Sequence, residues 1–242
     1  MTPADLRSAQ EALRDRRWAE AEALAEAAWA ADPAAPLAVQ ILAQARLGLA
    51  DAQSAAGQAP AAIATLTRAC AMRPAPLSAF IRLGEALKSA GDLAGAEAAF
   101  LEGLGLAPDA QALWLGLASV RMARDDRDGA RAALARLDAD RFGACVAWGQ
   151  LATLEGAFSE AAEWFARARA QRPDFAPVRL EWARALGEAG DRALAEAELR
   201  ALGQAGAAPL GRLILALADS AHGRAFLRPR DAAAFLTGPV SA

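Results

Sequence analysis

The side chains best suited to catalysis or metal binding are scarce in this sequence. Its 242 residues include one histidine, His222, and two cysteines, Cys70 and Cys145, which lie far apart in the chain. A structural zinc site usually takes four Cys or His ligands, and a catalytic one takes three. These residues cannot build the usual zinc site, so the sequence predicts no metal ion and no cofactor.

Each candidate reactive group also has a structural explanation. Cys70 and Cys145 lie in apolar helical stretches, which favours buried free thiols over a disulfide. The acidic pair Asp125 and Asp126 lies in an expected turn, where solvation or helix capping accounts for it. His222 is expected to end a helix rather than to act as a general base. No strand is expected to precede a glycine-rich phosphate loop, so we predict that the chain is not an enzyme.

Composition predicts helices and narrows the range of partners. The chain is 55% hydrophobic but only 6% aromatic, and it is rich in alanine, the best helix former. Its net charge of -3 gives no support for binding to nucleic acid or to an anionic membrane. No run of about eighteen apolar residues is free of charges and helix breakers, and the first residues do not resemble a signal peptide. A cytoplasmic location is therefore expected.

The elements that position the side chains recur along the chain. Each copy has a turn, then a helix with an early alanine, and usually a closing proline. The clear copies are 16–33, 57–74, 91–108, 156–173 and 190–206, and 125–140 is a weaker one. Pro74 and Pro108 lie 34 residues apart, and the pattern between them is typical of two amphipathic helices broken once at "AGD".

This pattern resembles the tetratricopeptide repeat family, whose 34-residue unit is a helix-turn-helix with W-x₂-L-G-x₂-Y, a small Ala, an aromatic residue and a proline. The best copy carries Phe80, Leu83, Gly84, Leu87, Ala96, Phe100 and Pro108. The resemblance covers roughly residues 4 to 206. It implies an all-α, right-handed superhelical solenoid of about six repeats, followed by a capping helix and tail at 209–242. The expected repeats are 1–33, 34–74, 75–108, 109–140, 141–173 and 174–208.

Small residues have two predicted roles within this pattern. The two helices of a repeat are expected to cross closely at Gly84, Ala118 and Gly149. Turns with positive φ, which glycine adopts at low cost, are expected at Gly91, Gly156 and Gly190. The first helix of the second repeat is expected to be lengthened, running roughly from 37 to 56.

The first helices of such repeats line a concave surface, which is the default binding site. The side chains predicted by helical phase to form a peptide-binding groove are Arg82, Glu85, Lys88, Leu115, Ser119, Met122, Val146, Gln150 and Arg184. The same phase is assigned to Arg7, Gln10, Arg14, Asp51, Ile81, Thr153, Glu181 and Glu188. The middle of the set is apolar and its ends are charged, which suits an amphipathic helix or an extended peptide. Leu115, Met122 and Val146 fit the core at least as well.

Three functions remain open. The first is a scaffold or adaptor that binds a protein or peptide, with no nucleic-acid and no membrane partner. The second is the N-terminal recruiting domain of a larger bacterial enzyme, such as a protein (flagellin) glycosyltransferase or a hydroxylase, because families similar in layout join such arrays to catalytic domains. The third is self-association through the open end of the stack. Family members that clamp a C-terminal carboxylate rely on asparagines, and this chain has none.

The C-terminal residues are expected to close the stack. A helix from about Pro209 to Ala221 has an apolar stripe formed by Leu210, Leu213, Ile214 and Leu217. Beyond it, exposure of four large apolar side chains would be costly: Phe226, Leu227, Phe235 and Leu236. Docking of this tail on the last repeats is therefore favoured over a free linker.

Overall fold

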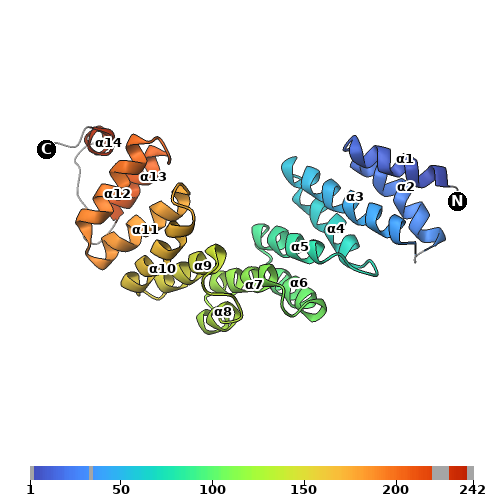
Figure 1. Cartoon of the computed structure of the whole chain (residues 1–242), viewed down its shortest axis with the longest axis horizontal. Coiled ribbons are helices and arrows are strands. Elements are labelled where there is room, and N and C mark those ends of the chain that lie inside the picture. Colours follow the sequence, from blue (N-terminus) through green and yellow to red (C-terminus); the bar gives the residue numbers. More distant parts are fainter. Residues whose placement is uncertain (1–2, 33–34, 220–228, 239–242) are drawn as a thin grey trace. The chain divides into compact units, whose positions relative to one another are not determined.

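The chain is built from helices that form two compact units (Figure 1). The computed structural model describes residues 3–32, 35–219 and 229–238. Within these ranges the regular elements are α-helices, and none is a strand. The first unit, Met1–Asp125, contains α1 to α7, and the second, Asp126–Ala242, contains α8 to α14. The predicted all-α class is confirmed.

The helix bounds follow the sequence pattern, with two helices inside each expected repeat range. In the first unit they are α1 (Pro3–Arg14), α2 (Trp18–Ala31), α3 (Pro36–Ala55), α4 (Ala59–Cys70), α5 (Leu77–Ser89), α6 (Leu93–Leu106) and α7 (Gln111–Ala123). In the second they are α8 (Arg127–Leu134), α9 (Phe142–Leu154), α10 (Phe158–Gln171), α11 (Ala176–Ala189), α12 (Arg192–Gln204), α13 (Leu210–Asp219) and α14 (Pro229–Thr237). The lengthened α3 has 20 residues, as its sequence predicts.

The turn between paired helices always contains a residue with positive φ. The expected glycines Gly91, Gly156 and Gly190 have φ values of 86°, 74° and 94°. Arg16 and Asp125 occupy the same place in two other repeats, with φ values of 57° and 59°. Arg16 is unfavourable there because its Cβ crowds the backbone in this region. Sequence reasoning did not identify these two as left-handed residues.

Close crossings occur at two of the predicted small residues, Gly84 and Gly149. A Cβ atom added to Gly84 would lie 2.4 Å from Cζ of Phe100, and one added to Gly149 would lie 2.7 Å from Cε1 of Phe165. Both phenylalanines are 1% exposed, and Ala118 is fully buried. Phe100 of α6 and Phe165 of α10 therefore pack directly against the first helix of their own repeats.

The last helices pack on the end of the second unit. Leu213 and Leu217 of α13 are buried in a cluster with Leu199 and Leu202 of α12. Leu210, which the sequence places in the same stripe, is instead 37% exposed. It is the first residue of α13, and the packed stripe begins one turn later.

The helix α14 docks on α12. Leu236 is fully buried in the cluster that α12 and α13 form, and Phe235 packs against it. Arg200 places its guanidinium carbon 4.8 Å from the centre of the Phe235 ring, and Gln204 Nε2 donates to the carbonyl of Gly238 at 2.8 Å. Docking therefore holds for this part of the tail. The expectations for His222, Phe226 and Leu227 lie outside the described residues.

Candidate functional site

Residues predicted to face inward meet in pairs across neighbouring first helices of the first unit. Arg82 of α5 donates through Nη1 to Oδ2 of Asp51 on α3, at 2.6 Å, and to the carbonyl of Leu47 at 3.2 Å. Lys88 of α5 donates through Nζ to Oγ of Ser119 on α7, at 2.7 Å. Helical phase thus identified side chains that share one surface, and we call the exposed surface of α1, α3, α5 and α7 the first-helix face.

A hollow of about 830 Å³ opens on this face. Its lining comes from the end of α1, the following turn, the start of α2, and the facing sides of α3 and α5. We call it the arginine hollow: Leu13, Arg14, Arg16, Trp18, Gln44, Leu47, Gly48, Asp51, Ala52 and Arg82. Three of its residues are cationic and one is anionic, so the lining carries a net positive charge.

An aromatic ring forms part of the wall of the arginine hollow. A Cβ atom added to Gly48 would lie 2.6 Å from Cε3 of Trp18. Only glycine therefore lets the indole of Trp18 lie this close to the α3 backbone. Together with Leu13 and Leu47, the ring gives the hollow an apolar side next to its charged one.

A smaller hollow of about 340 Å³ adjoins the first. It shares Asp51 and Arg82 with the arginine hollow and adds Glu85, another predicted site residue. Its remaining lining consists mostly of alanines and serines from α3, α4 and α5. The ion pair between Asp51 and Arg82 therefore borders both hollows.

The second unit has a hollow of about 300 Å³ with a different charge. We call it the glutamate hollow: Thr153, Phe158, Glu181, Arg184, Ala185, Glu188 and Ala216. Nη1 of Arg184 lies 3.8 Å from Oε1 of Glu181. Four of these residues, Thr153, Glu181, Arg184 and Glu188, have the inward phase predicted from the sequence.

The other predicted site residues line none of these three hollows. Leu115 and Met122 are half-buried in the first unit, and Gln150 is exposed in the second. Val146 is half-buried and packs against the buried cluster that contains Phe165 and Trp182. For Val146 the contacts favour the core interpretation that the sequence left open.

The two cysteines are buried free thiols, as the sequence suggests. Burial, with a smaller contribution from Glu102, raises the pKa of the Cys70 thiol to about 12. Burial also raises the pKa of Cys145, whose Sγ donates to the carbonyl of Ala139 at 3.2 Å. Neither thiol is activated as a nucleophile, because nucleophilic cysteines have lowered pKa values.

Across the described ranges, no group of three or more His, Cys, Asp or Glu side chains could hold a metal ion. The same part of the chain has no helix long and apolar enough to cross a membrane.

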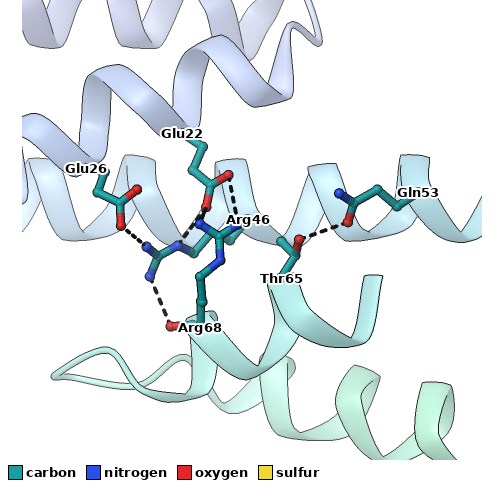
Figure 2. Close-up of polar contacts among 6 residues, drawn as sticks. All are labelled: Glu22, Glu26, Arg46, Gln53, Thr65 and Arg68. Carbon is teal, nitrogen blue, oxygen red and sulfur yellow. Dashed lines mark hydrogen bonds and ion pairs between the residues drawn. The ribbon is translucent and has the colours of Figure 1, made fainter. Parts of the chain in front are cut away.

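Sequence reasoning missed a buried charge network in the first unit (Figure 2). Arg46 of α3 is 3% exposed and donates through Nε to Glu22 at 3.0 Å and through Nη2 to Glu26 at 2.6 Å. Its Nη1 donates to the carbonyl of Arg68 at 3.0 Å, and the Arg68 side chain in turn pairs with Glu22. Because every guanidinium nitrogen has an acceptor, the charge of Arg46 is compensated despite its burial.

A spacing of 24 residues could have revealed this network. Glu22 pairs with Arg46, Glu97 with Arg121, and Arg131 with Glu155. In each pair the first partner directly follows a fully buried alanine of a second helix: Ala21, Ala96 or Ala130. The spacing therefore connects one repeat to the next within each unit.

Solved structures share this fold at low sequence identity. A tetratricopeptide repeat protein from Parabacteroides merdae aligns over 96% of this chain and 97% of its own, with 14% identity and a TM-score of 0.65. PilF of Pseudomonas aeruginosa aligns over 86% and 93%, with 17% identity and a TM-score of 0.61. A thermophilic repeat protein from Thermus thermophilus aligns over 76% and 97%, with 24% identity and a TM-score of 0.51.

Sequence comparison adds no closer relative: no protein-family model and no curated protein matches the chain. The repeat pattern, the paired helices, the glycines at crossings and turns, and the likeness to solved structures agree with one another. The chain therefore has the all-α helical-repeat fold of tetratricopeptide repeat proteins.

Proposed function

We propose that the chain is a protein-binding scaffold that holds a peptide segment on its first-helix face. The observation that carries the proposal is the arginine hollow. Its volume of about 830 Å³ falls in the range of sites that enclose several side chains or a small ligand. The hollow also combines an apolar wall with charged groups, which is the composition of specific binding sites.

Each part of the hollow has a role in this proposal. An apolar side chain of the partner would lie against Leu13, Trp18 and Leu47, where removal of apolar surface from water supplies affinity. The charged groups at its edge would orient the partner and select its sequence. The first helices are held by core packing, so the site is largely formed before the partner arrives.

The remaining predicted residues extend the same proposal. In the first unit, Glu85, Lys88 and Ser119 would contact a longer peptide beyond the hollow, with Leu115 and Met122 next to them on α7. In the second unit, Arg184 and the exposed Gln150 would form a separate contact around the glutamate hollow. The partner would be a protein or peptide met in the cytoplasm, and this chain would not be catalytic.

Recruitment of a substrate for a larger enzyme, the alternative that the sequence raises, would use the same face. A peptide would be bound in the same way whether or not a catalytic domain followed. Binding of a peptide to the first-helix face can therefore be tested directly with the full chain.

The test is a selection of random twelve-residue peptides displayed on phage against the full chain. The peptides recovered are then measured with two matched variants of α3. Ala52→Trp fills the arginine hollow, and Ala55→Trp adds the same side chain at another exposed alanine that does not line it. We expect Ala52→Trp to weaken binding at least about tenfold and Ala55→Trp to leave it unchanged. Equal affinities for both variants, with unchanged circular dichroism, would place the site elsewhere.

A further inference from the structure

The charges of the arginine hollow point to a class of partner. We propose that the hollow binds an acidic residue next to an apolar one, and that Asp51 competes with the partner's carboxylate for Arg82. This inference rests on the proposed function, because it names the chemistry of the segment that the first-helix face would hold.

The positive charge of the lining is the reason to expect an acidic residue in the partner. Arg14, Arg16 and Arg82 face a single acidic residue, Asp51, among the ten lining residues. The excess is positive although the whole chain has a net charge of -3. Arg14 and Arg16 form no ion pair with any residue that the structure describes, so their donors are available to a partner. An anionic side chain is the complement of this set.

The apolar wall of the hollow is the reason to expect an apolar residue next to the acidic one in the partner. Trp18 lies close to the α3 backbone at Gly48, and it lines the hollow together with Leu13 and Leu47. An isolated carboxylate would leave this wall in contact with water. A peptide in which Asp or Glu neighbours Leu, Ile or Phe satisfies both sides of the hollow at once.

The ion pair between Asp51 and Arg82 is the reason to expect competition for Arg82. Oδ2 of Asp51 lies 2.6 Å from Nη1 of Arg82, and the two side chains are 62% and 38% exposed. An exposed ion pair is weak because water screens it, so another carboxylate can replace Asp51. Arginine has five N–H donors, and its fork matches a carboxylate bidentately. A partner carboxylate on Arg82 would also be repelled by Asp51, which lowers affinity until Asp51 moves aside.

The test uses the peptides selected against the full chain. We expect acidic residues next to Leu, Ile or Phe to be enriched among them. One selected peptide is then synthesised with its acidic residue intact and with Gln or Asn in its place. We expect the amide version to bind at least about tenfold more weakly, the range for a charged hydrogen bond.

Variants of the chain assign the contact. Arg82→Ala should weaken the acidic peptide at least about tenfold. Arg212→Ala, which removes the same charge from an exposed position of α13 outside the first-helix face, should change affinity less than about twofold. Asp51→Asn should tighten binding by about threefold to tenfold, since it removes the repulsion and frees Arg82. Thermal melting checks that each variant is folded. If Arg82→Ala does not fold, Arg82→Lys, which keeps the charge but loses the guanidinium fork, takes its place.

The outcomes separate this inference from the proposed function. If no peptide is selected, the proposed function fails and the inference fails with it. If peptides are selected that lack acidic residues, or that bind Arg82→Ala unchanged, the chain binds peptides but the inference is wrong. If Asp51→Asn weakens the acidic peptide, the competition is overturned and Asp51 belongs to the binding surface instead.

Discussion

Each unit contains an ion pair between residues 24 apart in sequence, but the pair in the first unit is buried and the pair in the second is much more exposed. In the first unit Arg46 and Glu22 lie 24 residues apart, with side chains 4% and 9% exposed. In the second unit Arg131 and Glu155 have the same separation and reversed charges, with side chains 49% and 23% exposed. Spacing along the repeats therefore decides which residues meet, whereas burial decides how much the fold should depend on them.

The hollows differ between the units as well. The arginine hollow has three arginines and one aspartate, whereas the glutamate hollow has two glutamates and one arginine. One helical-repeat fold can thus present opposite charges on its first helices. Because charge complementarity governs which partner is accepted, the two units would select different segments.

The largest expected effect is the loss of the buried arginine. Arg46→Ala leaves Glu22 buried without its main partner, which costs about 3–5 kcal/mol. The matched change Arg131→Ala in the second unit should cost at most about 1 kcal/mol, because its pair is exposed. Hydrogen exchange in increasing urea measures each unit separately. Similar costs for both variants would contradict the role assigned to burial.

Truncation of Leu236 tests the helix that ends the second unit. This residue is fully buried between α14 and α12, so Leu236→Ala should destabilise the unit by about 2–5 kcal/mol. Thr237→Ala changes the exposed neighbour and should have little effect. The measurement is the free energy of unfolding together with the exchange rate of amides 232–236. If these amides in the unchanged chain exchange as fast as those of a free peptide, α14 is not docked.

Overpacking compares the helix crossings of the two units. Gly84→Leu and Gly149→Leu should each destabilise the fold by about 1–3 kcal/mol, because Phe100 and Phe165 occupy the space. The effect should be larger for Gly84, where a Cβ would make the closer contact. Gly105→Leu is the control, since a Cβ at this helical position would meet nothing within 4 Å. Thermal melting compares the three variants. An unchanged melting temperature for Gly84→Leu would mean that α5 and α6 cross less closely than the structure shows.

The smallest expected effect concerns the turn residues. Arg16→Gly should stabilise the first unit by about 1 kcal/mol, because glycine adopts a φ of 57° without strain. Gly156→Ala in the second unit should destabilise it by at least about 1 kcal/mol for the converse reason. Denaturant unfolding measures both changes. Two shifts of the same sign would be incompatible with this explanation.

Much of the fold could be predicted because its signals are local. Gly84 and Gly149 indicated close crossings, and the length of α3 followed from the distance between closing prolines. Buried Arg46 could not be predicted from its neighbours, since its partners come from α2 and from the end of α4. The positive φ of Arg16 was missed because the closure of two packed helices imposes it on a residue that does not favour it.

The candidate site was predictable only in part, and its role in binding stays a prediction. Helical phase placed Arg14, Asp51 and Arg82 on one surface, and the structure brings them to one hollow. Phase alone could not separate groove from core at Val146, because a half-buried residue can belong to either. Nor could it find the contribution of Trp18, which begins a second helix and reaches the hollow only because Gly48 leaves room.

The most direct test of the central claim is a double-mutant cycle between the chain and its peptide. The affinity of a selected acidic peptide and of its amide version is measured for the unchanged chain and for Arg82→Ala. If the arginine hollow holds the carboxylate, the two changes are coupled by about 1–3 kcal/mol, because each removes the same contact. A coupling energy of zero, with both peptides still bound, would show that the partner's charge is recognised elsewhere.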